Sequence, residues 1–114
     1  MTFQEVATLI SSIGLPYAYY QFPEADPNNP APDPPFVCFY FSGSDDLAAD
    51  NTNFAKIRPL VIELYTDNKD FTLEETVETA LNSAGLVFSR DETYIDAERL
   101  YMVTYNTEIV LKEN

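Results

Sequence analysis

The sequence predicts an α+β fold: a mainly antiparallel sheet of about five strands with two helices packed on it, in the order α-β-β-β-α-β-β. Two segments have apolar residues at helical spacing between cap and stop residues, and five segments are rich in aromatic and β-branched residues. Most connections are short enough for antiparallel hairpins. The 114 residues, 46% of them hydrophobic, predict a single domain over 1–114.

The first helix is predicted over residues 3–13. Thr2 and Glu5 have the spacing of a capping box, in which each side chain bonds the backbone of the other. Gly14 and Pro16 then predict the end of the helix. One apolar face is expected to pack on the sheet: Val6, Leu9, Ile10 and Ile13.

The next segment connects two predicted strands, at 17–22 and 36–42. Residues 23–35 read PEADPNNPAPDPP and hold six of the eight prolines. Proline cannot donate to a strand ladder, so this segment is predicted to be a stiff, proline-rich acidic loop that forms a long hairpin connection. Its PxxP patterns have no basic anchor nearby, which disfavours the role of a peptide ligand.

The central part of the chain carries the strongest strands. Residues 36–42 are apolar on both faces, which predicts that both faces are covered. Residues 43–53 are polar and predict a loop. A third strand follows over 54–66, and its Pro59 predicts an edge position or a bulge.

The C-terminal part contains the second helix and two more strands. Thr72 and Glu75 again have the spacing of a capping box, Gly85 predicts the stop, and the helix is placed over 73–84. Strands are predicted over 86–95 and 99–111, the second with clear alternation of apolar side chains on one face.

The charge is strongly acidic, with 19 acidic and 6 basic residues and a net charge of −13. The basic residues are scattered, whereas phosphate recognition needs clustered lysines and arginines, so specific nucleic-acid binding is not expected. An anionic membrane surface is disfavoured for the same reason. No apolar run approaches the roughly 18 residues of a membrane span, and the N-terminal segment lacks the basic start of a signal peptide.

Residues that would carry chemistry are few. The chain has no histidine, and Cys38 lies mid-strand among aromatics, where a buried inert thiol is expected. The acids Asp45, Asp46 and Asp50 lack the ligand spacing of a calcium loop, and three glycines do not make a phosphate loop. We therefore expect no enzyme activity, no cofactor and no metal; a hydrolase with two facing carboxylates stays the open alternative.

Apolar side chains exceed what two thin helices are expected to cover. Some of them are therefore candidates for contact with another subunit: Tyr19, Phe39, Phe41, Leu47, Leu100 and Met102. The competing interpretation is that they fill one core.

Several segments carry a resemblance to a known family. They are PPFVCFY (34–40), ADN (49–51), IELYTDNKD (62–70), the helix followed by Gly85, ETYI (92–95) and LYMVTYNTEI (100–109). With these segments the chain resembles small proteins of the tail-terminator and head–tail connector (tail-completion) group, encoded among the tail-assembly genes of long-tailed phages and prophages of Gram-positive bacteria. The resemblance covers nearly the whole chain.

This resemblance implies a non-enzymatic protomer that closes into a homo-oligomeric ring, typically a hexamer. The ring would cap the tail tube, join it to head-side connector proteins, and reside in the tail or neck of the virion after assembly in the bacterial host cytoplasm. Two alternatives stay open: a minor tail component, or a monomeric acidic adaptor or inhibitor that binds a basic partner.

The charge then suggests how DNA could pass through such a ring. Six copies would carry 6 × −13 = −78, and carboxylates lining the bore would repel phosphates. The candidates for bore lining or partner contact lie in two segments: Glu24, Asp26 and Asp33 in the proline-rich loop, and Asp45, Asp46 and Asp50 in the loop at 43–53.

Overall fold

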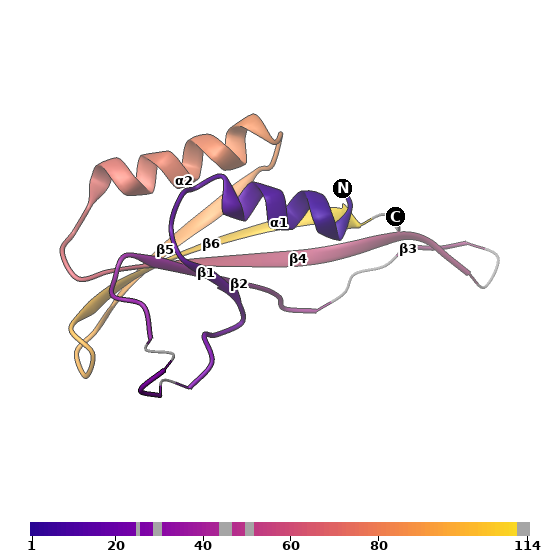
Figure 1. Ribbon diagram of the computed structural model, residues 1–114. Coiled ribbons are helices and arrows are strands. Elements are labelled where there is room, and N and C mark those ends of the chain that lie inside the picture. Colours follow the sequence, from indigo (N-terminus) through magenta and orange to yellow (C-terminus); the bar gives the residue numbers. More distant parts are fainter. Residues whose placement is uncertain (25, 29–30, 44–46, 50–51, 112–114) are drawn as a thin grey trace.

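Two helices and six strands follow one another along the chain in the computed structural model (Figure 1). They are α1 (Phe3–Ser11), β1 (Tyr17–Tyr19), β2 (Phe36–Phe41), β3 (Leu47–Ala49), β4 (Thr52–Thr66), α2 (Phe71–Ser83), β5 (Phe88–Ile95) and β6 (Leu100–Leu111). The structure describes residues 1–24, 26–28, 31–43, 47–49 and 52–111. The predicted α+β class and the order of the main elements are confirmed, with β3 as an additional short strand.

The sheet has the strand order β1-β2-β4-β6-β5. All of these pairs are antiparallel except β1 with β2, whose register runs in parallel from Tyr17 opposite Val37 to Tyr19 opposite Phe39. Parallel neighbours need a connection that returns to the starting end of the sheet. The prediction that residues 23–35 form a hairpin connection is therefore wrong, because this segment is a crossover.

The long strand β4 extends beyond the rest of the sheet (Figure 1). Its pairing with β6 begins at Lys56, opposite Leu111, the last described residue, and within the described part of the chain residues 52–55 pair only with β3. β3 lies inside the stretch 43–53 that was predicted to be a loop. The molecule measures 50 × 32 × 24 Å, and its radius of gyration of 15.5 Å exceeds the ~13 Å typical of a compact chain of this size. The β3–β4 hairpin is therefore a projecting arm.

Pro59 lies in the central strand β4 rather than in an edge strand, so the edge prediction is wrong. β2 ends at Phe41, opposite Leu60, and the N–H of Ser42 donates to the carbonyl of Pro59 at 3.0 Å. In an antiparallel strand the N–H and C=O of one residue point to the same side. The missing N–H of Pro59 therefore faces the side where β2 has just ended.

The main core lies between the sheet and the two helices, which cover the same face (Figure 1). The row Phe39, Ile62 and Tyr105 crosses three strands in register and is at most 3% exposed. The buried core comprises Val6, Ile10, Ile13, Val37, Phe39, Leu60, Ile62, Leu64, Val77, Leu81, Val103, Tyr105 and Ile109. We call this the helix face of the sheet and the other side the open face.

The observed helix ends lie within two residues of the predicted ones, and three of the four predicted cap or stop residues lie outside the helices, as a cap or stop requires. Thr2 forms the predicted capping box with Glu5. Gly85 has φ 76° and follows α2, where the N–H groups of Gly85 and Leu86 close the last turn on Asn82 and Leu81. Near Gly14 (φ 87°) α1 ends, two residues earlier than predicted.

The predicted cap of α2 is wrong. Asp70, not Thr72, is the N-cap, because its carboxylate accepts from the N–H of Leu73 at 2.9 Å. The helix consequently starts at Phe71, and Thr72 lies within its first turn.

Candidate assembly surfaces

The sheet ends in two outer strands, β1 and β5, each with a single hydrogen-bonded neighbour among the described strands. β5 is eight residues long and six of them are exposed; β1 has three residues. The unpaired N–H and C=O groups of an outer strand are a template for pairing with another chain. The molecule therefore offers two different edges to partners.

Exposed aromatic rings gather beside the β1 edge on the helix face. Phe3 of α1 is 49% exposed, and Tyr17 and Tyr19 of β1 are 42% and 47% exposed. The ring of Phe3 lies 6.3 Å from that of Tyr19 and 6.0 Å from that of Phe41, while Tyr19 meets Phe39 edge-on at 5.3 Å. We call Phe3, Tyr17 and Tyr19 the β1 patch. Aromatic rings are enriched at protein interfaces, which favours this patch as a contact surface.

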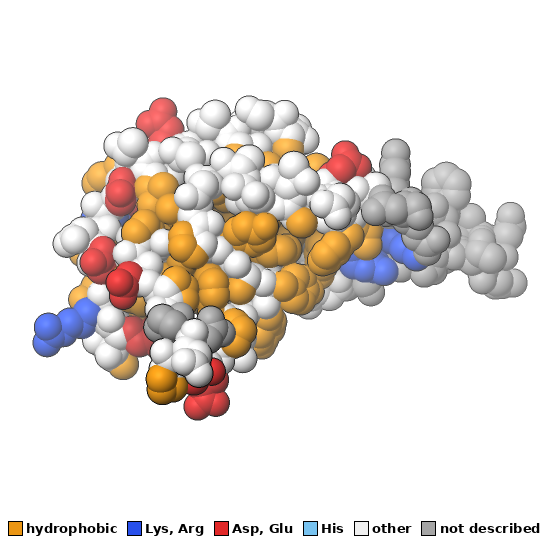
Figure 2. All heavy atoms as spheres, in the orientation of Figure 1, with side chains coloured by type: hydrophobic (Ala, Val, Ile, Leu, Met, Phe, Trp, Pro, Cys, Tyr) orange, Lys and Arg blue, Asp and Glu red, His pale blue; other side chains and the backbone are white. Residues whose placement is uncertain are grey.

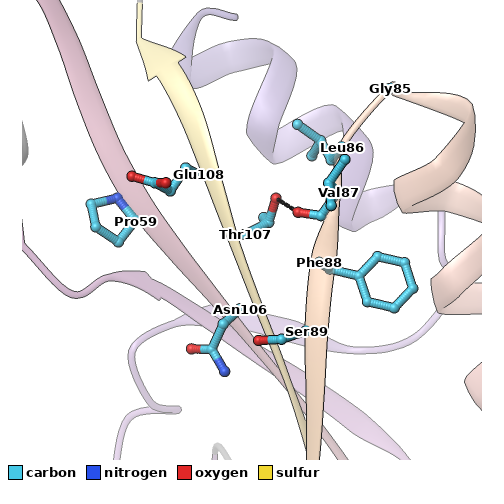
Figure 3. Close-up of a pocket in the computed structure, with 9 residues that line it drawn as sticks. All are labelled: Pro59, Gly85, Leu86, Val87, Phe88, Ser89, Asn106, Thr107 and Glu108. Carbon is cyan, nitrogen blue, oxygen red and sulfur yellow. Dashed lines mark hydrogen bonds between the residues drawn. The ribbon is translucent and has the colours of Figure 1, made fainter.

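An open groove lies near the opposite edge of the sheet, at the connection between α2 and β5 (Figure 3). Its volume is about 630 Å³, and Leu86, Val87 and Phe88 line it together with residues of β4 and β6. Val87 is 89% exposed, and the hydroxyl of Thr107 donates to its carbonyl at 2.6 Å. This bond holds the backbone at Val87, whose apolar side chain is exposed. We call the site the β5 groove.

Figure 2 shows that orange, hydrophobic side chains cover much of one side of the molecule, with red carboxylates along their border. This distribution contrasts with the net charge of −13, because the acids do not break up the apolar surface on that side. Contiguous apolar surface on a soluble domain marks a contact site more often than isolated exposed residues do.

A cluster of charges lies between α2 and β5. Glu74 is 4% exposed and is ion-paired with both Lys69 and Arg90. The hydroxyl of Tyr105 donates to Glu78 at 2.9 Å, and Arg90 also contacts that carboxylate at 3.7 Å. Removing a buried carboxylate from its cations is costly, so the cluster fixes α2 on the sheet.

The pKa values in this cluster follow from these contacts. The hydrogen bond to Glu74 raises the pKa of Arg90. Burial alone would lower the pKa of Lys69, but its bonds to Glu74 and Glu92 raise it. Burial, followed by the bond to Glu78, raises the pKa of Tyr105. The raised pKa values keep Arg90 and Lys69 charged and Tyr105 neutral at neutral pH. The carboxylates here bind cations of the same chain, an arrangement that suits structure rather than acid–base catalysis.

The residues predicted to meet a partner lie in different environments. Tyr19 is exposed in the β1 patch, and Phe41 and Met102 are half-buried. Phe39 is 3% exposed and Leu100 is 9% exposed. The odd-numbered side chains of β2 point to the helix face, so Phe39 packs in the core and offers no surface to a partner. The side chain of Leu47 lies outside the described residues.

The acidic residues predicted to line a bore or contact a partner fall into two groups. Glu24, Asp26 and Asp33 are all exposed in the crossover segment. Asp45, Asp46 and Asp50 lie outside the described residues. Across the part of the chain that the structure describes, no group of three or more His, Cys, Asp or Glu side chains is arranged to hold a metal ion. Neither described helix is long and apolar enough to cross a membrane.

Three exposed residues of these surfaces were not among those predicted to contact a partner: Phe3, Tyr17 and Val87. Phe3 precedes Val6 and Ile10 by three and seven residues, so helical spacing places it at the N-terminal end of the apolar face of α1, although its ring is 49% exposed. An aromatic residue in the first turn of the helix is a signal that could have been used. Val87 was assigned to a strand, but β5 begins at Phe88, and the carbonyl of Val87 accepts a bond from Thr107, twenty positions away. No local pattern contains that information.

The fold itself defines a class of small α+β proteins with both helices on one face of a mixed sheet. A chain in the solved structure "Virion of native gene transfer agent (GTA) particle" has a similar fold, with a TM-score of 0.58 and 14% sequence identity, over 95% of this chain and 88% of that chain. At this identity the shared property is the fold. Neither a family model nor a curated protein sequence matches the chain.

Proposed function

We propose that this chain is a structural protein of a phage-like virion, and that it acts there as a tail terminator or neck connector. In this role several copies form a ring that caps the tail tube and joins it to the head. The observation that carries the proposal is the similarity in fold, over nearly the whole of both chains, to a chain of a gene transfer agent virion. The sequence resemblance to tail-completion proteins points to the same role.

The two edges of the sheet support a ring rather than a two-fold dimer. The β1 edge carries exposed aromatic rings, and the β5 edge has the groove beside it. When the β1 edge of one subunit contacts the β5 edge of another, the first subunit still has a free β5 edge and the second a free β1 edge. Further copies therefore add head to tail until the rotation between them closes a ring, of which a hexamer is the expected size.

The projecting β3–β4 arm supports contacts in addition to those made by the β1 and β5 edges of the sheet. Its backbone extends past the end of β6, where residues 52–55 pair only with β3 among the described strands. A hairpin that leaves the body of the subunit can lie across a neighbouring subunit or along the tail tube. It also adds interface area without disturbing the core.

The acidic charge gives the ring a property suited to DNA passage. Glu24, Asp26 and Asp33 project from the crossover segment, and all are exposed. If this segment faces the bore, the carboxylates repel phosphates and favour sliding over binding. A ring whose bore is lined by neutral or basic side chains would contradict this part of the proposal.

Growth of tail tubes in vitro tests the role. Purified tail-tube protein from the same genome is polymerised with and without the chain, and tube lengths are measured by electron microscopy. The chain is expected to shorten the tubes and to remain at one end. Incorporation along the tube indicates a minor tail component, and tubes of unchanged length with no bound chain favour the monomeric adaptor.

A matched pair of variants tests the edge contact. Phe3→Ala together with Tyr19→Ala removes two exposed rings of the β1 patch and is expected to abolish capping. Phe71→Ala removes the exposed ring of α2, which is 71% exposed and lies outside the β1 patch, and is expected to leave capping unchanged. Equal loss in both variants would argue against the β1 edge as the contact.

A further inference from the structure

An aromatic pocket lies on the open face of the sheet, where the crossover segment folds back on β2 and β4. Its volume is about 290 Å³. Phe36 and Cys38 come from alternate positions of β2, and Tyr65 is the register partner of Phe36 on β4. Tyr20 and Phe22 come from the start of the crossover segment, and Glu98 comes from the β5–β6 turn. These six side chains define the pocket.

The rings of the pocket are held by one another. Phe36 stacks on Tyr65 with a centroid distance of 5.0 Å, and Phe22 meets Phe36 edge-on at 5.3 Å. Tyr20 has φ 69°, a conformation that is unfavourable for a residue with a side chain. Its N–H donates to Phe39, and its ring lies 5.3 Å from that of Tyr40 on the open face. The backbone thus turns sharply at the place where an aromatic side chain joins the pocket.

Carboxylates give the pocket a negative potential. Glu98 lines it, and Glu63 accepts a hydrogen bond from the hydroxyl of Tyr65 at 2.9 Å. Burial and then Glu63 raise the pKa of Cys38 to about 11, and the pKa of Tyr65 is raised by burial and by both carboxylates. The described residues that line the pocket include no lysine or arginine. The site therefore combines aromatic faces with negative charge and lacks its own cation.

We propose that the aromatic pocket binds an arginine side chain from a basic segment of a partner polypeptide. A guanidinium group stacks on aromatic faces and can donate to a carboxylate in the same pose, which matches Tyr20, Tyr65 and Glu98. A space of about 290 Å³ is at the lower limit for drug-sized ligands and suits a single side chain. The partner is recognised by charge complementarity with this strongly acidic chain. The inference does not depend on ring formation.

Titration of the ¹⁵N-labelled chain with a short peptide tests the site. The probe is acetyl-Gly-Arg-Gly-amide, and acetyl-Gly-Gln-Gly-amide is the neutral control. The arginine peptide is expected to give saturable shifts at the amides of Phe22, Cys38 and Glu98, and the glutamine peptide none. A third peptide, acetyl-Gly-Lys-Gly-amide, tests whether any cation suffices. Absence of saturable shifts, or equal binding of the arginine peptide and either of the other two, would overturn the proposal.

Two pairs of variants make the test specific. Tyr20→Ala and Glu98→Gln change exposed members of the pocket and are each expected to weaken binding about threefold to thirtyfold. Tyr94→Ala and Asp96→Asn change an exposed tyrosine and an exposed acid outside the pocket, and are expected to leave binding within about twofold. Retained dispersion of the amide spectrum confirms folding of each variant. Equal weakening in both pairs would show a non-specific charge effect instead of a site.

Discussion

The two faces of the sheet differ in what covers them. On the helix face Phe39, Ile62 and Tyr105 form a row that is at most 3% exposed, beneath α1 and α2. On the open face the row of Phe36, Tyr65 and Met102 is only half-buried, and the crossover segment covers one end of it. The same strands thus build a closed core on one side and a partly hydrated aromatic surface on the other.

This difference assigns separate roles to the two faces. Full burial of apolar side chains supplies most of the stability of a small domain, so the helix face should dominate the free energy of unfolding. The open face retains aromatic rings and carboxylates that can contact a partner without disturbing that core. Changes to the buried row of the helix face should therefore mainly alter stability. Changes to the open face, like changes to the exposed β1 patch at the margin of the helix face, should mainly alter binding.

The largest expected effect is that of Tyr105→Ala on the helix face. Tyr105 is fully buried, packs edge-on against Phe88 at 5.4 Å, and bonds Glu78. The variant should lose about 3–5 kcal/mol in the free energy of unfolding, measured with urea. Tyr40→Ala on the open face, where the tyrosine is half-buried, should lose about 1 kcal/mol. Equal losses would remove the contrast between the faces.

Glu74→Gln is expected to have the next largest effect. It keeps the shape of the side chain and removes the charge that binds Lys69 and Arg90, so the free energy of unfolding should fall by about 1–3 kcal/mol. Glu92→Gln changes a carboxylate of the same cluster that is 37% exposed, and it should cost less than about 1 kcal/mol. The assignment of Glu74 as the buried centre of the cluster would be wrong if the two variants were equally destabilised.

Asp70→Ala tests the cap of α2. Loss of the bond from the N–H of Leu73 should cost about 1 kcal/mol, and Thr72→Ala should cost less than about 0.5 kcal/mol. Thermal unfolding of both variants provides the measurement. A larger loss of stability for Thr72→Ala than for Asp70→Ala would support Thr72 as the N-cap, as the sequence predicted.

The smallest expected effect is the pH dependence contributed by Glu92. Its hydrogen bond to Lys69 lowers the pKa of the carboxyl below the ordinary value of 4.5. The contribution to stability is therefore complete above pH 4.5 and is lost as the pH falls through the lowered folded-state pKa. The difference in free energy of unfolding between the wild type and Glu92→Gln should be present at pH 6 and shrink toward pH 3. A difference that grows on acidification would have the wrong sign.

The sequence predicted those parts of the fold that local patterns determine. The capping box at Thr2, the stop at Gly85 and the alternation in β6 each involve residues close in the chain, and each was found. Asp70 and Thr72 are both good N-cap residues two positions apart, so the local rule could not choose between them.

Tertiary arrangement accounts for the remaining differences. The aromatic strand β2 is apolar on both sides, and the sequence alone does not show which side the helices cover. Phe39 was therefore a candidate for a partner contact as well as for the core, and the structure buries it in the core. The parallel pairing of β1 with β2 places Tyr20 and Phe22 beside Tyr65, more than 40 residues away. The β5 groove brings together Pro59, Val87 and Thr107, and Thr107 bonds the carbonyl of Val87. Sites of this kind arise from contacts that the chain order does not show.

Averaging of electron micrographs of tail-tube ends tests most directly the proposal that the chain caps the tail tube as a ring. Tubes grown from the purified tail-tube protein are mixed with the chain, and images of their ends are aligned and averaged. We expect a closed ring of several copies at one end of each tube, with the sheet edges of neighbouring subunits in contact. Bare tube ends, or a single copy bound at varying positions, would contradict the claim.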